Sequence, residues 1–192
     1  MPRTPIRSAR LALGLALFLP GCSVLSKEPP VEVRWFVPTV SVPESQPTTA
    51  VVNLRKIQSS RPLRDEMVWW RSDVELAFDA RHKWAEDPTE TLARAMHLQC
   101  AALGVELTTV PGDASARVDL TRFGGRFEGS DGAVAEITLT IAYETKDLVR
   151  HERVVAEEPL QSDDPEELAR GLGRALDRAA AEAAGHLQNW TR

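Results

Sequence analysis

The side chains able to do nucleophilic or metal chemistry are few and scattered. The chain has two cysteines and four histidines, which are Cys22, Cys100, His82, His97, His151 and His186. Zinc sites need thiolates and imidazoles at close, regular spacing, so we expect no metal and no cofactor. Serines in turn-like segments, Ser59, Ser60 and Ser130, have no histidine at a spacing typical of a catalytic pair, and no nucleophile elbow or phosphate-binding glycine loop occurs. The sequence predicts a protein that is not an enzyme, with a site assembled from distant residues left open.

Cys22 is the exception, because it follows a segment typical of a secretory signal peptide. The start of the chain carries arginines and no acid, an apolar run fills residues 11–19, and Leu19-Pro20-Gly21-Cys22 follows. These four residues resemble a bacterial lipobox, in which the cysteine thiol receives a diacylglyceryl group and the cysteine becomes the new N-terminus. We therefore expect a signal peptide at 1–21 and a lipidated tether at 22–30. An ordinary secreted protein with a chance cysteine is the alternative.

Composition excludes several classes of protein. A length of 192 residues favours one domain, and 43% apolar with 27% charged residues is ordinary for a globular chain. No run of about 20 apolar residues is present, which excludes a polytopic membrane protein. The net charge of −5 gives no electrostatic footprint for nucleic acid, so we expect no nucleic-acid partner.

Two helices begin with the same local pattern. Asp87-Pro88-Thr89-Glu90 and Asp164-Pro165-Glu166-Glu167 each offer a capping carboxylate followed by proline at the first helical position. Apolar residues then recur at helical spacing, which predicts amphipathic helices over about 88–103 and 165–188. Cys100 falls within the first apolar stripe and is expected to be a small core residue.

Alternating and β-branched stretches predict a sheet between and around these helices. We expect Glu136, Thr138 and Thr140 on a solvated face, a bulge or bend at Gly124-Gly125, and a hairpin about Ser72-Asp73. The predicted fold is α+β, with a mainly antiparallel sheet carrying both helices in a single domain over 31–192. The expected strands are 31–37, 50–57, 67–71, 74–78, 105–110, 117–127, 133–143 and 148–157.

After Cys22, the tryptophans are the second group of residues that we expect to have a function, in this case binding a partner. Trp69 and Trp70 are neighbours in a predicted strand, so their side chains must point to opposite faces of the sheet. We expect one to enter the core and the other to be exposed, covered by a loop, or covered by a partner, since tryptophan is enriched at binding hot spots. Together with Trp84 they are the candidate partner-binding residues.

Several blocks of the chain resemble the ABC-type transport auxiliary lipoprotein family, which includes the lipoprotein partner of the paraquat-inducible intermembrane transport system. After the lipobox comes an aromatic strand at residues 34–38. An apolar-aromatic strand ending in arginine, Met67-Val68-Trp69-Trp70-Arg71, follows. His82-Lys83-Trp84-Ala85-Glu86-Asp87-Pro88 is similar to the element that precedes the family's first helix.

The resemblance implies an accessory role in lipid transport between membranes. Such lipoproteins are thought to dock the periplasmic mammalian-cell-entry component of an ABC transporter at the outer membrane. Ser23 agrees with that location, because an aspartate after the cysteine retains lipoproteins at the inner membrane in many Gram-negative bacteria. The alternatives are an accessory lipoprotein of another envelope assembly or lipopolysaccharide-export machine, and a lipid-anchored periplasmic enzyme. The oligomeric state stays open, a homo-oligomer included.

The first prediction concerns the membrane anchor. Two or more acyl chains on Cys22 give stable attachment, so Cys22→Ala should release the mature body or leave it as precursor. Membrane fractionation and the mass of the N-terminal peptide measure this. Unchanged fractionation together with an N-terminal peptide that carries no acyl mass would show that the anchor is assigned wrongly.

Overall fold

Three long antiparallel strands form the centre of the sheet in the computed structural model, which describes residues 31–60, 63–128 and 132–192. They are β7 (Ser115–Glu128), β8 (Gly132–Glu144) and β9 (Val149–Leu160), which pair in chain order. The three strands predicted here are confirmed; β7 and β8 extend slightly beyond both expected ends, and β9 begins one residue later and ends three residues later than expected. The expected bulge or bend at Gly124-Gly125 is wrong: both glycines stay in register with β8, and the shift in pairing falls between Leu120 and Arg122.

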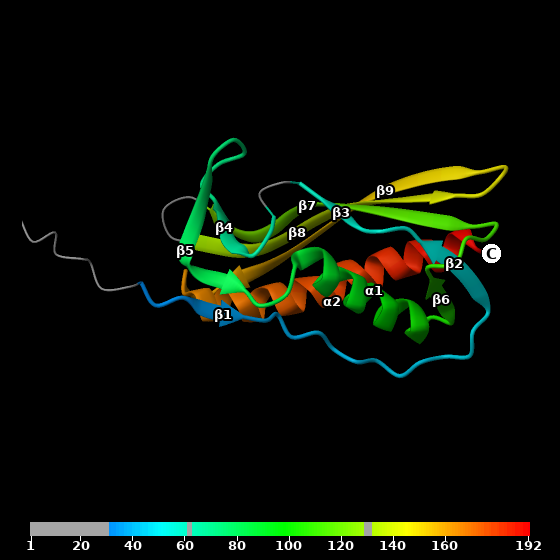
Figure 1. The fold of residues 1–192 in the computed structure, drawn as a ribbon, viewed down its shortest axis with the longest axis horizontal. Coiled ribbons are helices and arrows are strands. Elements are labelled where there is room, and N and C mark those ends of the chain that lie inside the picture. Colours follow the sequence, from blue (N-terminus) through cyan, green and yellow to red (C-terminus); the bar gives the residue numbers. More distant parts are fainter. Residues whose placement is uncertain (1–30, 61–62, 129–131) are drawn as a thin grey trace, which may run out of the picture. The chain divides into compact units, whose positions relative to one another are not determined.

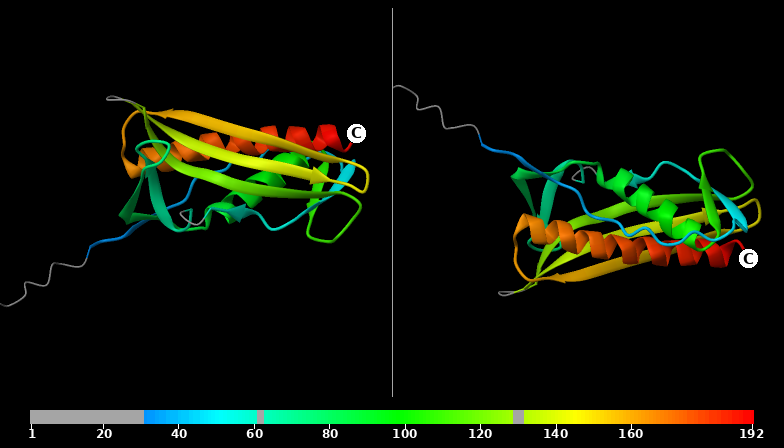
Figure 2. Two further views of the ribbon diagram at one scale, coloured as in Figure 1. Left: turned by 90° about the horizontal axis from the view of Figure 1, so that it is seen from above. Right: turned by 90° about the horizontal axis from the view of Figure 1, so that it is seen from below.

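Both helices lie on one face of this sheet (Figures 1 and 2). Helix α2 (Pro165–Trp190) packs along β8 and β9, and α1 (Pro88–Ala102) packs against α2. The predicted apolar stripe of α2 is confirmed, since every member is fully buried: Leu168, Leu172, Leu176, Ala179, Ala183 and Leu187. Neither of these helices is both long and apolar enough to cross a bilayer, in the part of the chain described.

The predicted helix starts are confirmed in atomic detail. The Asp87 carboxylate accepts a hydrogen bond from the Thr89 amide at 2.8 Å, and Asp164 accepts one from the Glu166 amide at 2.7 Å. Each aspartate therefore satisfies an amide that has no partner inside the helix. Cys100 is fully buried, and burial raises the pKa of its thiol to about 12, so it is a neutral core side chain.

Shorter strands extend the sheet on the other side of β7. They are β1 (Arg34–Phe36), β2 (Ala50–Leu54), β3 (Gln58–Ser59), β4 (Glu66–Trp70), β5 (Leu76–Trp84) and β6 (Val105–Thr108). The predicted hairpin is confirmed as β4 and β5, which pair antiparallel, whereas β1 pairs with β5 in parallel and β4, β2 and β3 pair with β7 in parallel. The α+β prediction is confirmed: the long ladders are antiparallel, and the parallel pairings are short. The signal peptide and tether predicted at 1–30 lie outside the described residues.

The segment between β1 and β2 crosses the outer side of both helices (Figure 2, right). The Ser41 amide donates to Asp177 of α2 at 2.9 Å, and the Gln46 amide donates to the Ala101 carbonyl of α1 at 2.9 Å. Gly173 allows the close approach, because a Cβ there would lie 2.5 Å from the Thr39 carbonyl oxygen. This segment, which we call the strap, limits where β1 can pair with the sheet.

An ion pair ties α2 to β9. Glu158 of β9 accepts from Arg174 Nε at 2.7 Å, and its second oxygen lies 2.7 Å from Arg178. Burial alone would raise the pKa of Glu158, but the hydrogen bond from Arg174 and the charge of Arg178 outweigh it and hold this pKa below its usual value of 4.5.

We therefore predict a pH-dependent contribution from Glu158. Because its pKa is lower in the folded state, the stabilisation is complete above the unfolded pKa and is lost as pH falls through the folded pKa. Glu158→Gln should lower the free energy of unfolding by about 1 kcal/mol at neutral pH, and the difference from the parent should shrink in acid. Thermal melts from pH 7 to pH 3 measure this. Exposed Glu152→Gln on the same strand is the control, and equal melting of the Glu158 variant and its parent at neutral pH would contradict the assignment.

Candidate partner-binding surface

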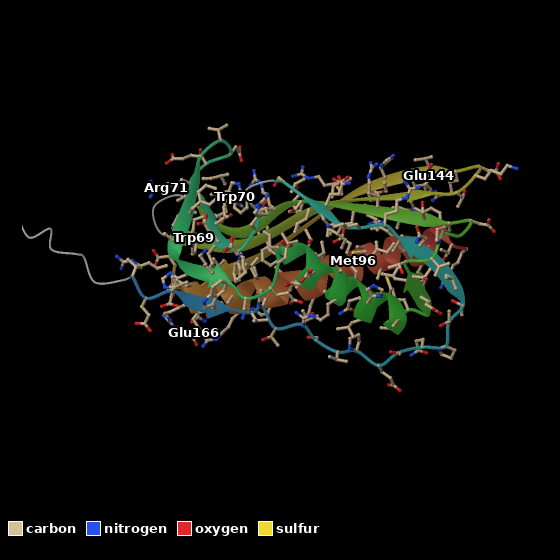
Figure 3. All side chains as sticks on the ribbon, viewed as in Figure 1. Trp69, Trp70, Arg71, Met96, Glu144 and Glu166 are labelled. Atoms are coloured by element: carbon tan, nitrogen blue, oxygen red, sulfur yellow. The ribbon has the colours of Figure 1, made fainter. Side chains whose placement is uncertain are left out.

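The hairpin of β4 and β5 carries the tryptophans that the sequence singled out (Figure 3). Trp69 and Trp70 point to opposite faces of β4, as predicted. The expectation that one of them is exposed is wrong, since Trp69 is 7% and Trp70 is 6% exposed. Trp84, at the end of β5, is 2% exposed and packs edge-on against Phe123 at 5.5 Å between ring centroids. None of the three candidate tryptophans offers a free ring to a partner.

Two glycines on the neighbouring strand explain the burial of both tryptophans. β4 pairs with β7 so that Trp69 stands opposite Gly125. A Cβ on Gly125 would lie 2.2 Å from the Trp69 ring, and a Cβ on Gly124 would lie 2.8 Å from the Trp70 ring. Each ring therefore fills the place of a missing side chain, one on each face of β7. The Gly-Gly pair is the signal for this contact in the sequence, although its pattern alone predicts a bulge or bend.

The face of the sheet that holds Trp70 also buries a carboxylate. Glu136 accepts hydrogen bonds from Arg122 at 3.1 Å, Arg126 at 2.7 Å and the Thr138 hydroxyl at 3.0 Å. The prediction that Glu136 and Thr138 are solvated is wrong, because Trp70 covers Gly124, which pairs with Glu136. These hydrogen bonds compensate for the loss of water around the Glu136 carboxylate. Arg122 also donates to Asp73 at 3.2 Å, which connects the tip of the hairpin to the sheet.

A groove of about 390 Å³ opens beside the buried Trp69. Its apolar side chains come from β4, β5 and β7, and its polar rim includes a residue that precedes α2. The lining residues are Trp69, Arg71, Ala77, Phe78, Asp79, Ala80, Arg81, Phe127 and Asp163. Phe127 stacks on Trp69 at 5.0 Å, and Phe78 is 50% exposed. Phe78 and Phe127 are the aromatic surface that sequence reasoning missed, because the strand pattern marked neither as exposed.

Asp79, which lines the groove, also pairs with His82. The ring of His82 lies 2.6 Å from Asp79, and the Arg81 amide donates to the same carboxylate at 2.9 Å. Burial would raise the pKa of Asp79, but these hydrogen bonds outweigh it and lower that pKa. Because the register of β4 and β5 shifts here, Asp79 closes the bulge in β5. In the described part of the chain, no hydroxyl or thiol bonds to His82, so the pair has no nucleophile to activate.

A larger hollow of about 630 Å³ lies between α1 and the β2–β3 segment. Its lining includes Arg55, Lys56, Glu90 and His97, together with Asp87, whose carboxylate already caps α1. It lacks the exposed aromatics of the groove beside Trp69. Within residues 31–60, 63–128 and 132–192, no three histidine, cysteine or carboxylate side chains gather closely enough to hold a metal ion. Cys22, the predicted lipidation site, lies outside the described residues.

Comparison with known families matches residues 36–184 to the family described as the ABC-type transport auxiliary lipoprotein component. The match covers strands β2 to β9, α1 and most of α2. A search of the curated proteins gives no significant match.

Solved structures share the fold at low sequence identity. Protein XCC0632 from Xanthomonas campestris superposes with a TM-score of 0.68 at 18% identity, covering 82% of this chain and 100% of its own. The hypothetical protein CT253 from Chlamydia trachomatis gives a TM-score of 0.53 at 8% identity, covering 74% of this chain and 97% of its own. At such identities these likenesses establish the fold alone.

Because the tryptophan rings pack directly on the two glycines, we predict that a single methyl group added at one of these glycines strongly destabilises the fold. Gly125→Ala should destabilise the protein by about 1–3 kcal/mol, because the Trp69 ring must leave its place. Gly112→Ala is the control, since nothing lies within 4 Å of a Cβ there. Denaturant unfolding measures both variants.

Combining Gly125→Ala with Trp69→Leu tests the contact itself. The smaller side chain removes the clash, so the double variant should lose less stability than the sum of the two single changes. Additive losses would show that the methyl group acts elsewhere.

Proposed function

The chain belongs to the ABC-type transport auxiliary lipoprotein family, and from that premise we propose that it docks the periplasmic component of such a transporter at the outer membrane. The component we propose is the subunit that carries a mammalian-cell-entry domain, and the cargo is lipid moving between the two membranes. In this proposal the protein binds and positions its partner and catalyses nothing.

The observation that carries the proposal is the apolar surface of the β4–β5 hairpin. Phe78 and Phe127 leave aromatic area open at the groove, and Val74 is exposed at the hairpin tip. Aromatic side chains in a concave site ringed by polar groups are the composition of a binding hot spot. The Arg122–Asp73 contact and the buried tryptophans hold this surface in place before a partner arrives, which lowers the entropy lost on binding.

The anchor and the chemistry of the described residues support the rest. Two or more acyl chains on Cys22 attach a protein stably to a membrane, and Ser23 agrees with sorting to the outer membrane. The single thiol in the described part of the chain, Cys100, is buried and protonated. The Asp79–His82 pair closes a bulge. These groups fit an accessory subunit better than an enzyme.

The test is recovery of the transporter component from the native envelope. Phe78→Ser should weaken its co-purification by about tenfold or more, because a truncated aromatic hot spot costs at least that much. Val110→Ser is the matched control, since Val110 is exposed at the other end of the sheet. Both variants should melt like the parent. Recovery of no mammalian-cell-entry component, or equal recovery with both variants, would refute the proposal.

A further inference from the structure

A second exposed apolar surface lies at the start of the described chain. Val31, Val33, Trp35 and Val37 are each between 39 and 57% exposed. Their spacing of two places them on one side of an extended chain, while Phe36 packs against the core from the other side. We call these four residues the N-terminal apolar edge. It is separate from the groove, whose lining includes none of them.

Strand β1 holds this edge at a fixed place on the sheet. It pairs in the described structure only with β5, through Arg34 with His82, Trp35 with Lys83 and Phe36 with Trp84. The Phe36 carbonyl also accepts from the Ala85 amide at 2.9 Å. Trp35 therefore stands at the border of the sheet with its ring turned outward.

The surroundings of Trp35 combine apolar groups with charges of both signs. The Lys83 ammonium lies 5.8 Å from the Trp35 ring centroid and donates to Asp65 at 2.8 Å. The hydrogen bond from Lys83 lowers the pKa of Asp65, and the same bond raises the pKa of Lys83, so both groups are charged at neutral pH. A tryptophan beside charged groups is the composition found at the interface between lipid and water.

The N-terminal apolar edge follows Cys22 closely in the chain, and this proximity to the acyl anchor determines which surface the edge meets. Nine residue steps separate Cys22 from Val31, so the chain holds Val31 within roughly 30 Å of the lipidated sulfur. A short tether makes the membrane contact intramolecular, with an effective concentration in the millimolar range. At that effective concentration, a millimolar affinity of this edge for lipid keeps it bound about half of the time, and a tighter one for longer.

We propose that the N-terminal apolar edge lies in the headgroup region of the bilayer and contacts phospholipid directly. The inference rests on lipidation of Cys22 and goes beyond it: the body is docked by a protein surface and not by acyl chains alone. Because β1 pairs with β5, docking this edge also fixes how β5 and its groove are presented above the membrane. Figure 1 shows β1 and the hairpin at the same end of the sheet, with β2 and β6 at the other.

The first experiment places the full lipoprotein in vesicles of phosphatidylethanolamine and phosphatidylglycerol that carry brominated acyl chains. Subtracting the emission of Trp35→Phe isolates the Trp35 contribution. We expect brominated lipid to quench it and the membrane to shield it from aqueous iodide. Equal iodide access with and without vesicles would overturn the proposal.

The second experiment measures vesicle binding of the mature chain, residues 22–192, carrying Cys22→Ser, which has neither acyl chains nor the apolar leader segment. Adding Trp35→Ser should lower its partition into vesicles by about tenfold or more, because interfacial binding scales with the apolar area buried. Val110→Ser is the control and should leave the partition unchanged. If Trp35→Ser alters only co-purification with a protein and not partition, the edge is a protein interface and the proposal is wrong.

The two experiments separate this inference from the anchor on which it rests. If the mass of the N-terminal peptide shows no acyl group, the anchor is assigned wrongly, and the partition of the Cys22→Ser chain still decides whether the edge contacts lipid. If Cys22 is acylated but brominated lipid leaves Trp35 unquenched, the anchor stands and the docking inference fails.

Discussion

The fold depends on covering the apolar face of three long strands, β7, β8 and β9. Exposing that face to water would forfeit about 25 cal/mol for each Å² that folding now buries. Helix α2 covers it with a face of buried leucines and alanines, and Ala175, Ala179 and Ala183 are fully buried. Such short side chains let the helix axis approach the sheet closely. Once α2 is in place, α1 has a surface to pack on and the strap from β1 to β2 has two helices to cross.

The β4–β5 hairpin is attached to the three long strands by the fit of its tryptophan rings more than by the surface area that it buries. Trp69 and Trp70 occupy both faces of β7 where Gly124 and Gly125 leave room, and Glu136 accepts the hydrogen bonds that secure the outer face. The attachment is specific, because a large ring needs a place without a side chain on the opposing strand. The result is an open groove in which Trp69 and Phe127 are surrounded by charged side chains.

The position of β5 links the two exposed surfaces of the protein. It supplies most of the residues that line the groove, and it pairs with β4 and with β1, which carries Trp35 of the N-terminal apolar edge. If the edge faces the membrane and the groove faces a partner, as we propose, this one strand sets the geometry between the two contacts. The family assignment gives the class of role, and the arrangement around β5 gives a physical basis for it.

The sequence by itself determined the features that depend on local chemistry. Asp87 and Asp164 begin their helices as expected, because a capping carboxylate needs only the amides of its own first turn. The stripe of α2 and the long strands followed from periodicity. The tertiary structure alone decided that Trp69, Trp70 and Glu136 are buried and that Phe78 and Trp35 are exposed. Burial depends on what packs against a side chain, and the glycines that admit the two tryptophans stand more than fifty residues away along the chain.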